Sequence, residues 1–181
     1  SIEDCTIPEC DSLALPGMSL CWKVSSPLVS IQRLSDWTVF LWGSARYKSG
    51  SKSSRKVAQE MVVSLSQGES LRSCLIKLEG SFGVLAWNEK ESRLVFATDP
   101  IGMTKVYYAE DRGKVVISSH AHRVARRLGN LAVSGDGISL LFSVKGIPAP
   151  YTVFDNVSVL NPSELVSVTK YEKISEEYWS I

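Results

Sequence analysis

The alternation of apolar and polar positions predicts a chain built mainly from short strands. The run WTVFLW at 37–42 is rich in β-branched and aromatic residues and ends at Gly43, as a strand does. Two apolar runs at 82–87 and 93–97 flank a polar turn, which is typical of a β-hairpin. Runs of this kind predict strands at 19–24, 29–31, 37–42, 82–87, 93–97, 105–109, 114–117, 151–160 and 165–168.

A second periodicity, with apolar residues three or four positions apart, predicts helices between the strands. Val57, Met61 and Leu65 lie on one helical face, and Ile138 and Phe142 lie on another. Antiparallel hairpins with helices between them predict an α+β fold, in which helices are layered on sheet. The predicted helices cover 55–68, 69–78, 121–129 and 134–146, each ending at or shortly before a glycine.

The first residues differ from the rest, because Pro8, Pro16 and Gly17 stand among acidic and small residues. Such a segment is typical of an extended stretch without a regular element. We therefore expect an extended leader over 1–17 and a single domain over 18–181. A chain of 181 residues has the length of one domain and can bury a core of its own.

Composition and charge narrow the class of protein. With 44% hydrophobic and 22% charged residues, the chain has the mix of a soluble globular domain. Its 20 Lys and Arg against 19 Asp and Glu leave a net charge of +1, which argues against nucleic acid or a membrane surface as partner. No apolar run approaches the ~20 residues that span a bilayer, and the acidic start does not resemble a secretory signal. These features predict a cytoplasmic protein.

Candidate metal ligands and general catalytic motifs are few. We expect reduced thiols and no metal site, because no C-x-x-C pair is present and the two histidines are one residue apart. The sequence contains no P-loop, no G-x-G-x-x-G and no G-x-S-x-G motif, so residue types and spacing alone identify no reaction. The cysteines and histidines are Cys5, Cys10, Cys21, Cys74, His120 and His122.

About half of the chain resembles a known family. Residues 78–88 (LEGSFGVLAWN) and 93–108 (RLVFATDPIGMTKVYY) are similar to the glutaminase domain of the asparagine synthetase family. The strand at 115–119, the segment IPAPYTVF at 147–154 and the pair YW at 178–179 follow in the order of that family. The residues that carry this framework are Gly80, Phe82, Asp99, Pro100, Gly102 and Tyr107.

The resemblance implies a class II glutamine amidotransferase of the N-terminal-nucleophile (Ntn) hydrolase type. Its fold is a four-layer αββα sandwich of two mainly antiparallel sheets. In active members an N-terminal Cys thiolate attacks the glutamine amide, and the free α-amino group of that residue serves as the base. An Asn side chain and the amide of the following Gly form the oxyanion hole.

The chain departs from this pattern at the catalytic positions, so we assign no catalytic residue. Twenty residues precede Cys21, and we regard Cys21, or secondly Ser1, as a nucleophile only if processing exposes it. Trp42 stands where the family has the oxyanion Asn, although Gly43 is kept. Three further replacements are Thr98 for Arg, Lys105 for Pro and His120 for Glu.

A framework kept without its catalytic residues is similar to the degenerate N-terminal domains of β-lactam synthetases and lasso-peptide cyclases. Those ligases take the amide nitrogen from their substrate and need no ammonia from glutamine. We therefore predict a catalytically inactive domain that supports an asparagine-synthetase-type, ATP-dependent amide-forming ligase. The expected partner is a synthetase domain in the same protein or complex, which uses ATP and magnesium, whereas this chain needs no cofactor.

Two alternatives stay open, namely an active glutaminase domain that supplies ammonia to an asparagine synthetase, and a free-standing interaction module. The Ser-Gly-Gly-x-Asp-Ser ATP loop of the synthetase domain is absent from the sequence. We therefore expect a fragment, a separately encoded subunit or one half of a cleaved protein. A chain that packs on a synthetase domain should expose an apolar surface when isolated, with 147–154 and Tyr178-Trp179 as its contributors.

Overall fold

The computed structural model describes residues 10–15, 18–23, 29–50, 53–111 and 114–180. Strands outnumber helices, as the apolar pattern predicts. The elements in chain order are β1 (Cys10–Leu15), β2 (Met18–Lys23), β3 (Val29–Leu34), β4 (Trp37–Tyr47), α1 (Ser54–Ser66), α2 (Leu71–Leu75), β5 (Leu78–Asn88), β6 (Arg93–Thr98), β7 (Tyr107–Asp111), β8 (Lys114–Ser118), α3 (Ala121–Leu128), α4 (Gly135–Val144), β9 (Ser158–Val159), β10 (Glu164–Val168) and β11 (Lys173–Glu177).

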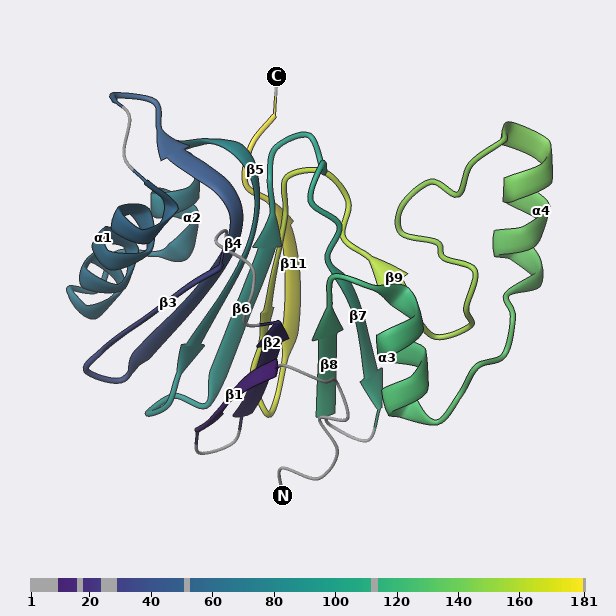
Figure 1. Ribbon diagram of the computed structural model, residues 1–181, viewed down its shortest axis with the longest axis horizontal. Helices are drawn as coiled ribbons and strands as arrows, with labels where there is room; N and C mark the ends of the chain where they lie inside the picture. The colour runs from purple at the N-terminus through teal and green to yellow at the C-terminus, as the bar shows by residue number, and fades with distance from the viewer. Residues whose placement is uncertain (1–9, 16–17, 24–28, 51–52, 112–113, 181) are drawn as a thin grey trace.

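The strands pair antiparallel throughout the described ranges. A six-stranded sheet has the order β11-β10-β6-β5-β4-β3, a three-stranded sheet has the order β8-β7-β9, and β1 and β2 form a separate hairpin. Figure 1 shows α1 and α2 outside the larger sheet and α3 outside the smaller one. This arrangement confirms the predicted α+β fold with four αββα layers.

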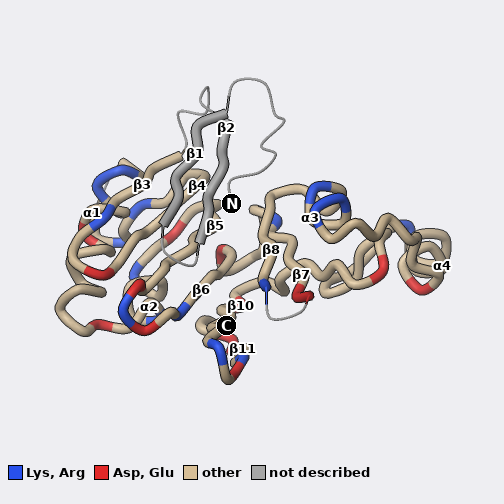
Figure 2. The backbone as a smooth tube through the Cα atoms, turned by 90° about the horizontal axis from the view of Figure 1, so that it is seen from below, with Lys and Arg blue, Asp and Glu red and all other residues tan. Residues whose placement is uncertain are grey.

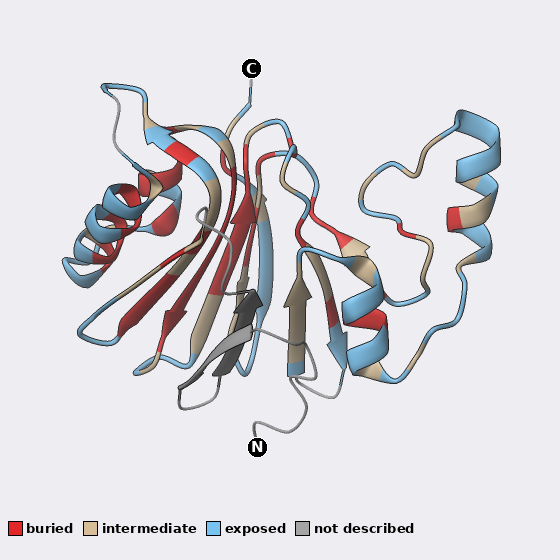
Figure 3. Ribbon diagram, in the orientation of Figure 1, coloured by how far each residue is buried: buried red, intermediate tan, exposed pale blue. Residues whose placement is uncertain are grey.

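Three hydrophobic clusters fill the three interfaces between these layers (Figure 3). Val57 and Met61 of α1 pack on the outer face of the larger sheet. Phe96 of β6 and Val106 belong to the cluster between the two sheets. Val124 of α3 packs on the smaller sheet in the third cluster. Burial of these apolar surfaces is what holds the four layers together.

β4 shows how a strand of alternating side chains joins two of these clusters. Val39 and Leu41 belong to the cluster under α1, whereas Phe40 and Trp42 belong to the cluster between the sheets. Successive side chains of a strand point to opposite faces of the sheet. A central strand with apolar layers on both sides therefore reads as a continuous apolar run.

Several predicted elements have different bounds in the structure, and three of them show the physical reason. β4 continues through Gly43 to Tyr47, because the chain after Gly43 still pairs with β5. The helix predicted over 69–78 is only α2, because Leu78 already pairs with Tyr47 as the first residue of β5. Of the strand predicted over 151–160 only β9 forms, since the Thr152 hydroxyl bonds the carbonyls of Phe154 and Val157 and holds a turn there.

Two strands lie where the pattern predicts no element. β1 occupies Cys10–Leu15 inside the predicted extended leader and pairs with β2, while residues 1–9 and 16–17 lie outside the described ranges. β11 has the sequence KISEE and forms the edge of the larger sheet. Four of its five residues are exposed, so it lacks the apolar alternation that marks a strand packed on a core.

Candidate active site

The position on β4 where the resemblance places the oxyanion Asn lies inside the larger sheet, opposite Gly83 of β5. Trp42 pairs with Gly83 across β4 and β5, and Gly83 pairs with Thr98 across β5 and β6. Directly paired residues of antiparallel strands project from the same face of a sheet. Trp42, Gly83 and Thr98 therefore form a row across three strands. The row joins the positions where the resemblance places an Asn and an Arg in active members.

The indole of Trp42 covers the glycine in this row. A Cβ atom built on Gly83 would lie 2.2 Å from Cζ2 of Trp42, so the ring occupies the space above Gly83. The ring also lies beside Phe40, with 5.6 Å between ring centroids. Its one polar atom, Nε1, is buried and has no hydrogen-bond partner in the described part of the chain. The sequence pattern singles out Trp42 but not Gly83, because strand register decides their pairing.

Backbone crowding explains Gly43, the residue that the resemblance places in the oxyanion hole. Its φ is +95°, a conformation that side chains with a Cβ rarely adopt, and a Cβ atom would lie 2.3 Å from the Ser81 carbonyl oxygen. Gly80 has the same constraint, with φ +111° and 2.1 Å to the carbonyl oxygen of Ser44. The close approach of β4 and β5 thus requires both glycines, whatever chemistry the site performs.

Asp99 organises the turn that follows β6. Its Oδ1 accepts hydrogen bonds from the N–H groups of Ile101 at 3.2 Å and Met103 at 3.0 Å, and its Oδ2 accepts one from Thr104 at 2.7 Å. The side chain is fully buried. A carboxylate surrounded by backbone donors is stabilised in place and holds the turn. Asp99 therefore has a structural role here.

The remaining framework residues also serve packing. Phe82 is fully buried under α1, and Tyr107 packs on the cluster below α3. Gly102, at φ +64°, would place a Cβ atom 3.2 Å from Cγ of Pro162. Pro100 directly follows Asp99 in the turn. Together these contacts explain the framework as the support of one turn and two packed layers.

Thr98, at one end of the row, belongs to a small network of hydrogen bonds. The Thr98 hydroxyl donates to the carbonyl of Thr104, and the Thr104 hydroxyl lies 2.8 Å from that of Ser81. Tyr178, predicted to contribute to an interface, instead donates from its hydroxyl to the Thr98 carbonyl and is 2% exposed. Trp179 packs partly buried against the core under α1. Sequence reasoning misses this network, since its members are far apart in the chain.

Lys105 and His120 do not belong to the row. Lys105 lines a small cavity of about 160 Å³ together with Tyr107. His120 precedes α3, and its Nδ1 lies 2.8 Å from the Ser119 hydroxyl oxygen. Burial lowers the pKa of His120, and the nearby Arg123 and then His122 lower it further. An imidazole in this setting is neutral at neutral pH.

Of the two candidate nucleophiles, Cys21 and Ser1, the structure describes only the backbone of Cys21. Ser1 lies outside the described residues. Cys21 is inside β2, where its backbone pairs with Ser12 of β1. In the chain as it stands, Cys21 is therefore an internal residue whose nitrogen is part of a peptide bond. It has no free amine of its own to act as a base.

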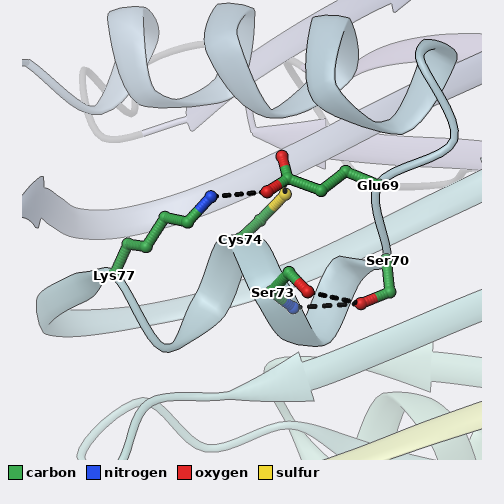
Figure 4. Close-up of polar contacts among 5 residues, drawn as sticks. All are labelled: Glu69, Ser70, Ser73, Cys74 and Lys77. Carbon is green, nitrogen blue, oxygen red and sulfur yellow. Dashed lines mark hydrogen bonds and ion pairs between the residues drawn. The ribbon is translucent and has the colours of Figure 1, made fainter.

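Cys74 of α2 is a free, buried cysteine, and Figure 4 shows its polar neighbours. Its thiol is buried and lies 4.0 Å from Oε2 of Glu69, whose Oε1 accepts a 2.5 Å hydrogen bond from Lys77. Burial, reinforced by the charge of Glu69, raises the pKa of Cys74 to about 11. The thiolate is the nucleophilic form, so this protonated thiol is inert at neutral pH.

A cavity of about 390 Å³ lies beside α2, on the part of the larger sheet that this short helix leaves uncovered. Its charged residues are engaged with neighbours, since Arg72 pairs with Glu176 at 3.0 Å and Arg93 lies 5.4 Å from the Trp37 ring centroid.

No group of three or more His, Cys, Asp or Glu among the described residues is placed to hold a metal ion. Nor does any described helix have the length and apolarity to cross a membrane.

The four layers accord with the amidotransferase class that the sequence resembles. Residues 45–179 match the family model of the glutamine amidotransferase domain, and the chain belongs to this family. The match begins two residues after Gly43. The family thus accounts for the fold and its framework, while Trp42 and Gly43 lie just outside the matched range.

Several known proteins are similar to the chain. The glutamine-hydrolysing asparagine synthetase 1 of Bacillus subtilis strain 168 is 24% identical over 92 residues, 51% of this chain and 15% of that protein. The structure of a B. subtilis glutamine phosphoribosylpyrophosphate amidotransferase with ADP and GMP aligns with 85% of this chain and 32% of its own, at TM-score 0.46 and 13% identity. An allosteric regulatory enzyme of purine biosynthesis aligns with 85% and 31%, at TM-score 0.49 and 13% identity. The chain spans no more than about a third of these relatives.

Proposed function

We propose that this glutamine amidotransferase domain is catalytically inactive and supports an ATP-dependent amide-forming ligase of the asparagine synthetase type. The observation that carries the proposal is the Trp42 indole, which fills the space over Gly83 where an active member would use an Asn side chain. An oxyanion hole needs donors about 2.7–3.1 Å from the oxyanion. The one donor of Trp42, Nε1, is buried and therefore out of reach of a substrate.

The neighbours of Trp42 support the same conclusion. Thr98, at a position where the family has an Arg, carries no charge, and its hydroxyl is already bonded to the Thr104 carbonyl. The Cys74 thiol, with its pKa of about 11, is no substitute nucleophile. A domain that lacks the oxyanion Asn and the Arg of the family pattern retains the fold without the chemistry.

The ligase role rests on the resemblance and on the asparagine synthetase of B. subtilis. We assign ATP and magnesium to a synthetase partner, in the same protein or in a complex, and the amide nitrogen to the substrate of that partner. The domain then contributes a surface instead of ammonia. A cytoplasmic location accords with this role, because thiols such as Cys74 stay reduced there.

Incubation of the purified chain with glutamine, followed by measurement of glutamate, tests the inactivity. We expect no more glutamate than from the heat-denatured chain, with B. subtilis asparagine synthetase 1 as the positive control. Glutamate formation that disappears in Cys21→Ala would overturn the proposal and favour the active alternative. Intact-mass measurement of the native protein would then show an N-terminus at Cys21, whereas residues still attached before Cys21 leave its thiol without an amine base.

A further inference from the structure

The largest group of exposed apolar side chains in the described residues lies on and around α4. Gly137 is the one buried residue of this helix. Figure 3 shows α4 standing away from both sheets and exposed over most of its length. Six of the thirteen exposed large hydrophobic residues fall between 131 and 151, which is far more than an even spread over the chain; they are Leu131, Val133, Leu141, Phe142, Val144 and Tyr151.

α4 is firmly anchored although it is hardly buried. The Ser134 hydroxyl caps the helix by accepting a 3.2 Å hydrogen bond from Gly137, and the Ser134 N–H donates to the Val153 carbonyl at 3.0 Å. Gly137 approaches Thr152 so closely that a Cβ atom would lie 2.1 Å from its carbonyl oxygen. The helix is thus presented in a fixed direction, which lowers the entropy that a partner must remove on binding.

The composition of α4 indicates what kind of surface covers it. Asp136 is its single charged residue, and Ser139 and Ser143 form a narrow polar stripe along an otherwise apolar helix. A helix that is apolar over most of its circumference is normally buried, which requires a groove that encloses it. A helix that lies on a membrane surface carries Lys or Arg on its polar face, and α4 has serines there.

The charge of the neighbouring helix α3 indicates the charge of the partner surface that receives α4. α3 contributes Arg123 and Arg126 and contains no acidic residue. In Figure 2 these basic positions lie between the smaller sheet and the projecting α4. Complementary charges favour encounter and fix the orientation of two surfaces. The surface that receives α4 should therefore be bordered by carboxylates.

We propose that the α4 surface, formed by the six exposed residues named above, docks into an apolar, acid-bordered groove of the synthetase partner. The inference rests on the proposed function and gives the partner its chemistry. It also places the interface away from Tyr178 and Trp179. The stretch 147–154 contributes through Tyr151, which is 50% exposed.

The test measures binding of the purified chain to the asparagine-synthetase-type synthetase of the same organism by isothermal titration calorimetry. Phe142 is 81% exposed, and Phe142→Ser should raise Kd at least tenfold while the melting temperature stays unchanged. Tyr171 is 89% exposed on the turn between β10 and β11, and Tyr171→Ser is the matched control, with less than a twofold effect. Arg123→Glu with Arg126→Glu should slow association.

Four other outcomes would contradict the inference, and each points to a different explanation. If the unaltered chain does not bind the synthetase, the proposed function fails and the inference fails with it. If it binds and Phe142→Ser binds equally well, the proposed function stands and the α4 surface is wrong. Sedimentation that shows a dimer converted to a monomer by Phe142→Ser would assign α4 to a second copy. Phe142-dependent binding to phosphatidylcholine–phosphatidylserine vesicles would assign it to a membrane.

Discussion

The phenolic oxygen of Tyr178 lies 2.7 Å from the carbonyl oxygen of Thr98 and donates a hydrogen bond to it. The backbone N–H of Tyr178 also donates to the Ser163 carbonyl at 2.9 Å, and Ser163 N–H donates to the Asp99 carbonyl at 3.1 Å. These bonds tie the end of the described chain to the turn after β6. The segment that follows β11 is therefore part of the domain core.

Tyr178→Phe removes this hydroxyl and should lower the free energy of unfolding by about 1–2 kcal/mol, because a buried hydrogen bond is lost. Each kcal/mol corresponds to a fall of about 2–4 °C in Tm for a domain of this size. Thermal unfolding followed by circular dichroism measures the change. The exposed Tyr171→Phe serves as control, and an equal Tm for both variants would show that the bond contributes nothing.

Asp99→Asn should destabilise the domain by about 2–3 kcal/mol. Either orientation of the amide places its NH₂ group against at least one of the three backbone N–H donors that the carboxylate now accepts. Urea titration of both proteins gives the difference in unfolding free energy. Asp36 is exposed, so Asp36→Asn should stay within about 0.5 kcal/mol of the unaltered chain. A comparable loss in both variants would contradict the structural role of Asp99.

Gly43→Ala should cost at least about 2 kcal/mol of stability, from the combination of a positive φ and the contact with the Ser81 carbonyl. Gly50 has open space around the position of a Cβ atom, and Gly50→Ala should be within about 0.5 kcal/mol of neutral. Denaturant unfolding of the two alanine variants compares them directly. A well-tolerated Gly43→Ala would mean that packing does not explain why this glycine is kept.

Alkaline pH should destabilise the domain through Cys74. Its pKa is raised from 9.0 to about 11 in the folded chain, so the folded state holds the thiol proton more tightly than the unfolded state does. The resulting stabilisation is complete below pH 9 and is lost as the pH rises toward 11. A shift of this size corresponds to about 2–3 kcal/mol.

The measurement is the free energy of unfolding of the unaltered chain and of Cys74→Ala at several pH values from 8 to 11. The difference between them should be constant up to pH 9 and should change above it. Burial, then Glu60 and then the Cys74 thiolate raise the pKa of Tyr47 to about 12, so above pH 9 the difference also contains the loss of this Cys74–Tyr47 repulsion. Parallel curves across the whole range would show that the thiol titrates alike in the folded and unfolded states.

Local features of the sequence are sufficient for much of the fold. The spacing of Val57, Met61 and Leu65 predicts α1, and the apolar runs on either side of 88–92 predict the β5–β6 hairpin, which the structure confirms. Both depend on residues close in the chain, where side-chain period and turn residues act directly. The framework around Asp99 is recognisable for the same reason, since its members lie within a few residues of each other.

Local sequence features predict the residues of the candidate site but not how they come together. Trp42, Gly43 and Thr98 are visible in the sequence as departures from, or agreements with, the family pattern. Their meeting at Gly83 depends on the register of β4, β5 and β6, and a shift of one residue would send Trp42 to the opposite face. Register is a property of the paired strands, and no single strand contains it.

The amino-acid sequence by itself determined the class of the fold, most of its elements and the positions, such as Trp42 and Thr98, where the chain departs from the family pattern. The tertiary structure alone decided that the Trp42 indole covers Gly83, that Tyr178 is core and that the apolar α4 has no covering layer among the described residues. Periodicity reports which residues avoid water, because that preference is local. Which surface each one meets is set by contacts between distant segments, which form only when the sheets and helices pack.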